Sequence, residues 1–200
     1  DPVRYLTNGS SGKMGYSLAA AAVNMGAEVT LVVGPNDMDT KPCEKIIKVR
    51  TAEEMYSATM SEFENCDIAI MSAAVADYRP KVYSDEKIKK NSEELVIELV
   101  KNRDILKSMG EVKKSQFLVG FAAESSNLIE NAVKKYEAKN LDMIVANSAS
   151  NIGSENNKVY IIKGKEQVKE LEEMKQEERA YHILREITAE EGEKNVKNNA

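Results

Sequence analysis

The chain has 200 residues, a formal net charge of -5, 42% hydrophobic residues and 30% charged residues. This length suits one α/β domain with a full core, and the acidic balance argues against a surface that coats nucleic acid. No apolar run approaches the roughly 18 residues of a membrane span, and no signal peptide is visible. Two distant cysteines, Cys43 and Cys66, and one histidine exclude zinc clusters, disulfide frameworks and Cys–His dyads, so we expect a cytoplasmic protein.

The first part of the chain alternates predicted strands and helices. Gly26 ends the first helix, and Thr51 with Glu54 forms a capping box at the start of the second. A strand–helix–strand unit of this length implies parallel strands. The predicted strands cover 3–7, 27–33, 45–49 and 67–74, and the helices cover 13–25 and the residues after Thr51.

The second part continues this alternation after an irregular basic segment. Strands are predicted over 94–100, 116–125 and 141–148, helices over 104–114 and 127–139, an antiparallel edge strand over 158–164 and a charged helix over 166–190. The pattern favours an α/β fold with a Rossmann-like, doubly wound, mostly parallel sheet and an antiparallel edge extension. We expect a single domain over residues 1–190 and a flexible tail over 191–200.

The segment TNGSSGKMG, residues 7–15, follows the first predicted strand. It lacks the Gly-x-x-x-x-Gly-Lys-Ser/Thr pattern of a P-loop. It also lacks the Gly-x-Gly-x-x-Gly pattern of a dinucleotide site, and no acid ends the second strand. Its backbone N–H groups, two hydroxyls and helix N-terminus still suit an anion. A glycine turn made only for tight packing is the alternative.

Two further segments follow predicted strands and carry residues suited to a nucleotide. Small residues in SAAVADYRP (72–80) let a flat group approach the backbone, and Asp77 offers a carboxylate to a metal ion or a ribose. Lys87, Lys89 and Lys90 suit a nucleoside triphosphate, which carries roughly four negative charges. A solvated charged loop is the alternative for these lysines.

The segment GFAAESSN (120–127) and the helix after it add polar residues with ordinary structural explanations. Glu124 could simply favour a helix start, Lys135 and Lys139 could form a solvent face, and Asn147 could end a strand. His182 is expected to be structural or exposed, because nothing near it in sequence completes a catalytic dyad.

Six segments in order resemble the phosphopantothenoylcysteine synthetase family of coenzyme A biosynthesis: DPVRYLTNGSSGKMG, AAVADYRP, EKIKK, KNRDIL, GFAAES and KNLDMIVANS. They extend from Asp1 to Ser148, and six such segments at matching spacing form a specific signal although each alone is weak. Members of this family are often fused behind a flavin-dependent decarboxylase. The opening DPVR resembles the start of the synthetase half, so the resemblance implies a decarboxylase domain upstream and no flavin in this domain.

The resemblance implies a ligase that activates 4′-phosphopantothenate with CTP and then joins it to L-cysteine, through an acyl-cytidylate. It implies catalytic roles for Asn8, which engages the acyl-cytidylate, and for Lys87, which is needed to form it and also binds the nucleotide. The other implied nucleotide contacts are Ser10, Ser11, Gly12, Ala73, Ala74, Asp77, Phe121, Lys135 and Lys139, with Lys89 and Lys90 as a supporting basic cluster.

The same resemblance implies Mg²⁺ as the metal, with Asp77 as its ligand, and a homodimer. The apolar segment 94–100 (ELVIELV) is a plausible pairing strand for that dimer. The chain departs from the family at Arg103, where proline is common, and at Ser125, where threonine is usual. The arginine puts the rigidity of the following helix start in question.

Two other functions stay open on sequence grounds. One is an NAD(P)-dependent oxidoreductase, although the acid that would bind the ribose is missing. The other is a non-catalytic regulator that binds a nucleotide without releasing pyrophosphate.

Overall fold

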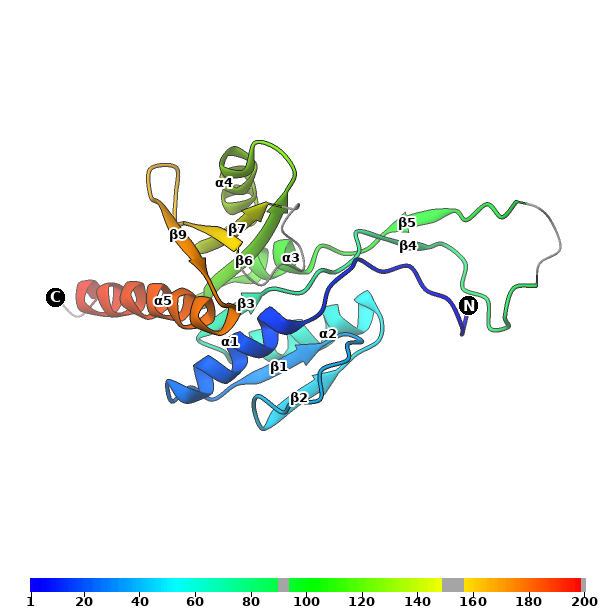
Figure 1. Ribbon diagram of the computed structural model, residues 1–200, viewed down its shortest axis with the longest axis horizontal. Coiled ribbons are helices and arrows are strands. Elements are labelled where there is room, and N and C mark those ends of the chain that lie inside the picture. Colours follow the sequence, from blue (N-terminus) through cyan, green and yellow to red (C-terminus); the bar gives the residue numbers. More distant parts are fainter. Residues whose placement is uncertain (90–93, 149–156, 199–200) are drawn as a thin grey trace.

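The computed structural model describes residues 1–89, 94–148 and 157–198 and has a five-stranded sheet at its centre (Figure 1). The strand order is β3-β6-β7-β8-β9. Strands β3, β6 and β7 are parallel, whereas β7–β8 and β8–β9 are antiparallel. The predicted α/β class is therefore confirmed, except that β9 and not β8 forms the antiparallel edge. The bounds are Ile68–Met71 for β3, Phe117–Glu124 for β6, Met143–Ser148 for β7, Asn157–Ile162 for β8 and Val168–Met174 for β9.

Helices cover both faces of this sheet, as the doubly wound prediction requires. Alternate residues of β6 face opposite sides, so Val119 packs with α1 and α5 while Leu118 packs with α2, α3 and α4. None of the helices in the described ranges is long and apolar enough to cross a bilayer. The helices are α1 (Lys13–Asn24), α2 (Ala52–Phe63), α3 (Ile105–Val112), α4 (Leu128–Ala138) and α5 (Gln176–Asn198).

A separate pair of parallel strands, β1 (Thr30–Val33) and β2 (Lys45–Lys48), lies beside α2. The predicted cap of α2 is present: Thr51 Oγ1 accepts a hydrogen bond from Glu54 N at 3.1 Å. The Glu54 carboxylate accepts one from Arg50 N at 2.7 Å, so the reciprocal contact falls one residue before the cap.

Strands β4 (Tyr78–Pro80) and β5 (Leu99–Lys101) pair in antiparallel fashion and begin a long arm that projects from the body (Figure 1). We call residues 78–101, apart from 90–93, the arm. Strand β5 falls at the end of the predicted strand 94–100. The N-terminal segment runs alongside the arm, where Arg4 Nη2 donates to Ile88 O at 2.9 Å and Asp1 Oδ2 accepts from Ile88 N at 3.2 Å.

Two secondary-structure predictions are wrong. Residues 3–7 form no strand: the backbone N–H groups of Val3 and Arg4 donate to the Asp1 carboxylate, and the apolar side chains stay exposed, with Tyr5 78% accessible. Residues 168–174 form β9 instead of helix, because Leu171 packs into the core while charged neighbours pair across the sheet, as Lys158 does with Glu170 at 2.7 Å. Helix α5 itself runs to Asn198, so helical backbone continues into the expected tail.

The junction of α3 and α4 depends on one glycine. A Cβ atom added at Gly110 would lie 1.9 Å from the carbonyl oxygen of Lys139, a distance that no packed atoms tolerate. Asn140, with a φ of 52°, closes the junction by donating from Nδ2 to Gly110 O at 2.9 Å. The end of α4 can therefore approach α3 only where α3 lacks a side chain.

We expect Gly110→Ala to lower the free energy of unfolding by about 2–4 kcal/mol, because the added methyl group forces the two helices apart. The higher helix propensity of alanine, worth about 1 kcal/mol, offsets only part of this loss. Urea unfolding monitored by circular dichroism provides the measurement. Gly34→Ala is the control, since its Cβ would meet Met55 Cε at an ordinary 3.7 Å. Equal stabilities for the two variants would contradict the close-approach argument.

Candidate nucleotide and acyl-transfer site

The glycine- and serine-rich loop contacts the segment that follows β3. Asn8 Nδ2 donates to the carbonyl of Val75 at 3.3 Å. A Cβ at Gly15 would lie 3.3 Å from Ser72 Oγ, so α1 starts close against the same segment. Asn8, Ser10 and Ser11 are exposed, and Gly12 is half-buried. Asn8 thus lies next to Ala73 and Ala74, both of which are also exposed.

The start of α1 leaves backbone donors available. Gly12 adopts the left-handed conformation with φ 74°, and α1 has neither a side-chain cap nor an acidic residue in its first turn. The hydroxyls of Ser10 and Ser11 form only long hydrogen bonds of 3.4 Å with Gly12 N and Lys13 N. A helix N-terminus of this kind favours an anion, because its N–H groups carry the positive end of the helix dipole.

The segment after β3 is fixed by Asn102, a residue that the sequence analysis did not single out individually. Asn102 Nδ2 donates to Ala76 O at 2.7 Å, and its backbone N–H donates to Asp77 O at 2.8 Å. Arg79 in turn donates to Asn102 Oδ1 at 3.1 Å. Asp77 is exposed at this point of the sheet edge. The signal for Asn102 was its place in the KNRDIL motif.

Asp104 links α3 to Lys139 at the end of α4. Its Oδ1 accepts the capping bond from Lys107 N at 3.0 Å, and Lys139 Nζ lies 2.9 Å from its Oδ2. Burial tends to raise the pKa of Asp104, but the bonds from Lys139 and Lys107 outweigh it and hold that pKa below the ordinary value. The Asp104 carboxylate is therefore a stable anion beside Lys139.

Arg103, which stands where the family has proline, makes contacts of its own. Its guanidinium lies 4.7 Å from the centroid of the Tyr56 ring and 3.5 Å from Glu53 Oε1. These contacts attach the start of α3 to α2, so interactions with α2 replace the backbone restriction that proline would impose.

A second ion pair lies at the end of β6. Lys135 Nζ is 2.6 Å from Glu124 Oε1, and the Glu124 side chain is only 14% exposed. Phe121 lies on the same strand, half-buried against the core on the α1 side. On the neighbouring strand β7, Asn147 pairs with Ala123 of β6. The carboxyl ends of β3, β6 and β7 therefore do carry the polar residues that the sequence placed there.

The lysines of EKIKK lie on the arm and not with this group. Lys87 and Lys89 are exposed on either side of Ile88, which Asp1 and Arg4 hold. Lys90 is outside the described residues. Asn8 therefore contacts the segment after β3, and Lys135 and Lys139 lie within and at the end of α4. Lys87 and Lys89 lie instead on the arm, which projects from the body (Figure 1).

The protein side chains at this site could bind a magnesium ion only together with the phosphates of a bound nucleotide. Within the described parts of the chain, no three His, Cys, Asp or Glu side chains cluster as a metal cage. One exposed carboxylate, Asp77, is nevertheless the usual protein share of a site in which phosphates and waters complete the Mg²⁺ shell.

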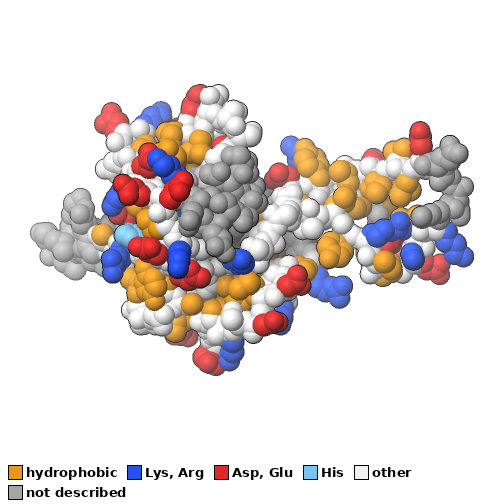
Figure 2. Space-filling view, viewed as in Figure 1, with side chains coloured by type: hydrophobic (Ala, Val, Ile, Leu, Met, Phe, Trp, Pro, Cys, Tyr) orange, Lys and Arg blue, Asp and Glu red, His pale blue; other side chains and the backbone are white. Residues whose placement is uncertain are grey.

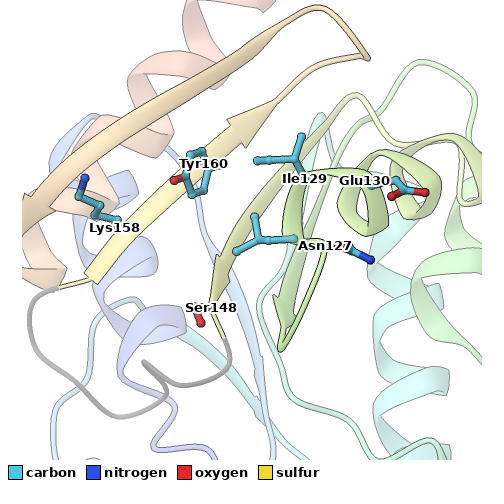
Figure 3. A pocket seen from close by; sticks show the side chains of 7 residues that line it. Asn127, Ile129, Glu130, Ser148, Lys158 and Tyr160 are labelled. Carbon is cyan, nitrogen blue, oxygen red and sulfur yellow. The ribbon is translucent and has the colours of Figure 1, made fainter.

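A cavity of about 490 Å³ lies between the start of α4 and strands β7 and β8 (Figure 3). None of the predicted site residues lines it, although Asn127 and Ser148 are the last residues of two segments singled out in the sequence, GFAAESSN and KNLDMIVANS. Its lining includes Asn127, Glu130, Ser148, Lys158 and Tyr160.

Burial raises the pKa of both cysteine thiols, Cys43 and Cys66, which disfavours the nucleophilic thiolate. His182 is half-buried on α5. Neither finding adds a residue to the candidate site.

Comparison with known proteins gives consistent matches. A relative from Borreliella burgdorferi, the coenzyme A biosynthesis bifunctional protein CoaBC, is 47% identical over 188 residues, which cover 92% of this chain and 48% of the relative. A relative from an unknown prokaryotic organism, named cysteine/cysteine sulfinic acid decarboxylase, is 46% identical over 195 residues, which cover 94% of this chain and 54% of that protein. The crystal structure of the C-terminal domain of a CoaBC protein has a TM-score of 0.83 and 42% identity, covering 96% of this chain and 89% of that one.

The chain spans about half the length of the curated relatives it matches. The family model described as the DNA/pantothenate metabolism flavoprotein C-terminal domain matches residues 1–190. The chain therefore belongs to this family, which confirms the resemblance to the synthetase half of the bifunctional coenzyme A proteins.

Proposed function

We propose that this chain is the ligase that joins 4′-phosphopantothenate to L-cysteine in coenzyme A biosynthesis, with CTP as the activating nucleotide. The observation that carries the proposal is the contact between Asn8 and the segment after β3, at the open N-terminus of α1. This contact joins two of the family's motifs at one edge of the sheet. The names of the relatives support the pathway.

In the first step, a carboxylate oxygen of phosphopantothenate attacks the α-phosphorus of CTP, the bond to the β-phosphate breaks, and pyrophosphate leaves. This step needs alignment and charge neutralisation more than acid–base catalysis. The N–H groups at the start of α1, Lys135 and Lys139 provide positive charge for the phosphates. Lys87, which lies on the arm and not with these residues, adds its charge where an arm reaches the nucleotide. Mg²⁺, held by Asp77 and the nucleotide, supplies further neutralisation when it is bound.

In the second step, the amine of cysteine attacks the acyl carbon, the bond to the cytidylate oxygen breaks, and the amine gives up a proton as CMP leaves. Asn8 is an uncharged donor that can hold an acyl or phosphate oxygen. Its amide points at the Val75 carbonyl in this structure, so a bound intermediate would compete with that carbonyl for the Asn8 donor.

The two alternatives receive less support. After β1 the residue beside Gly12 is Asn36, whose Cβ lies 3.6 Å from the Gly12 Cβ position, and not the acid that an NAD(P) ribose requires. A non-catalytic regulator is less well supported, because the family match covers all six of the motifs that resemble those of the ligase. We also propose a second, flavin-dependent domain upstream in the full-length protein, which the half-length match to bifunctional relatives supports, and a cytoplasmic location.

Pyrophosphate release tests the nucleotide. With phosphopantothenate present, we expect CTP to support release at least about tenfold faster than ATP, since about 1.4 kcal/mol of base discrimination gives that ratio. A coupled pyrophosphate assay under matched magnesium provides the rates. Equal rates would remove CTP selectivity from the proposal, and no release with either nucleotide would remove the ligase.

We expect Asn8→Ala to release pyrophosphate but to form little amide, because the intermediate loses its donor. Lys87→Gln should block pyrophosphate release itself by about 100-fold, since a charge at the transferring phosphoryl group is lost. Both steps are followed separately, by pyrophosphate release and by mass spectrometry of the product. Lys81→Gln is the control for Lys87, because Lys81 lies on the same arm but pairs with Glu98 at 2.7 Å. Wild-type rates in either variant would exclude that residue from its role.

We further propose that the arm forms a homodimer with the arm of a second copy. The arm bears a series of exposed apolar side chains, which Figure 2 shows as orange surface on the projecting part of the molecule. An exposed apolar hairpin is stable when a second copy covers it. In this dimer the arm carries Lys87 and Lys89 to a surface shared by two protomers. The side chains are Tyr78, Val82, Tyr83, Leu95, Val96, Ile97 and Leu99.

A charge on the arm should prevent this association. Val96 is 90% exposed, so Val96→Asp should leave the fold intact while it shifts the protein from dimer to monomer. Sedimentation velocity gives the mass. Val112→Asp, at an exposed position at the end of α3, is the matched control and should stay dimeric. A monomeric wild-type protein, or a dimeric Val96→Asp protein, would refute the arm as the interface.

A further inference from the structure

Both lysines that α4 offers to a nucleotide are held by carboxylates. Lys135 and Lys139 lie four residues apart, so both point from the same face of the helix. Lys135 Nζ lies 2.6 Å from Glu124 Oε1, and Lys139 Nζ lies 2.9 Å from Asp104 Oδ2. The charges of these four groups therefore cancel.

Both carboxylates are held in place by other groups, although the Asp104 side chain is 45% exposed. Glu124 is the last residue of β6 and is 14% exposed, and its other oxygen accepts a bond of 3.4 Å from Asn131 Nδ2. Asp104 is the N-cap of α3, so its position follows from the start of that helix. Glu124 comes from β6 and Asp104 from the start of α3, so neither ion pair is formed between two residues of α4 itself.

An ammonium group has three N–H donors, and one carboxylate leaves donors that can still reach a phosphate. The acids therefore fix the direction of each lysine without removing it from the site. They do cancel its long-range attraction for an anion. At the candidate site, the charges of the two lysines are neutralised and Asp77 adds a negative charge. A free nucleoside triphosphate, with roughly four negative charges, is therefore not attracted to it over long range.

We propose that Glu124 and Asp104 are specificity-determining residues that make this site select the magnesium-bound nucleotide over the free nucleotide. This inference rests on the proposed function, because it assumes that α4 faces the nucleotide. Magnesium binding removes about half of the negative charge of the triphosphate. The two fixed carboxylates therefore repel the magnesium complex less than they repel the free nucleotide. Without them, the lysines would attract free nucleotide and trap it in an unreactive complex.

The test measures affinity and not turnover. Isothermal titration calorimetry gives the dissociation constant of CTP in excess Mg²⁺ and in EDTA, without phosphopantothenate, for the wild-type protein and for Glu124→Gln. We expect the preference of the wild type for the magnesium complex to shrink by about three- to tenfold in the variant, mainly through tighter binding of free CTP. Glutamine keeps the size of the side chain and removes only its charge.

Asp104→Asn provides an independent second variant, because asparagine also caps helices, and we expect the same direction of change. Glu137→Gln is the matched control. It removes the same charge from an ion pair of α4, with Lys165 at 3.2 Å, but away from the site, and it should leave the preference unchanged.

An unchanged preference in both Glu124→Gln and Asp104→Asn would overturn the inference. So would equal weakening with and without magnesium, which is what a merely structural role predicts. If the wild-type protein bound no CTP under either condition, the proposed function would fail first, and this result differs from the other two.

Discussion

The close approach of α3 and α4 at Gly110 is the constraint on which the α4 side of the candidate site depends. The Lys139 carbonyl lies where any side chain at residue 110 would lie, so α4 ends directly against the last turn of α3. That approach brings the Lys139 ammonium to Asp104 at the start of the same helix. The part-buried ion pair of Lys113 with Asp142 at 2.8 Å then attaches the end of α3 to the start of β7. The packing of the two helix backbones therefore fixes the positions of the two lysines of α4.

Most of the sheet was predictable because its centre is buried on both faces. Strand β6 reads as a continuous apolar run, and its neighbours obey the alternation that separates the two hydrophobic clusters. The capped helix α2 was predictable for a local reason, since Thr51 and Glu54 satisfy its first N–H groups. The positions of Asp77 after β3 and Glu124 at the end of β6 follow from this topology, whereas Asn8 reaches the segment after β3 from residues that form no strand.

The rest could not be read from local sequence because it is decided by distant partners. Residues 3–7 have a strand-like pattern, yet the segment is attached through Arg4 and Asp1, which both bond to Ile88 on the arm. Strand β9 looks like a charged helix, because its lysines and glutamates pair with β8 and α5, as Lys169 does with Glu186. The role of Asn102 depends likewise on two carbonyls some 25 residues earlier. The ion pairs of Lys135 and Lys139 were equally invisible, since a solvent face would carry the same residues.

The N-terminal segment links the arm to the candidate site mechanically. Arg4 holds the arm at Ile88, and Asn8 holds the body at Val75. Three residues lie between Arg4 and Asn8, so the fully stretched backbone spans at most about 14 Å between their Cα atoms, and the two side chains add a fixed further reach. Any swing of the arm beyond that length must pull Asn8 off the Val75 carbonyl or release Arg4. The segment therefore couples the arm to the site: the lysines on the arm cannot move far without a change in the contact that the Asn8 amide makes.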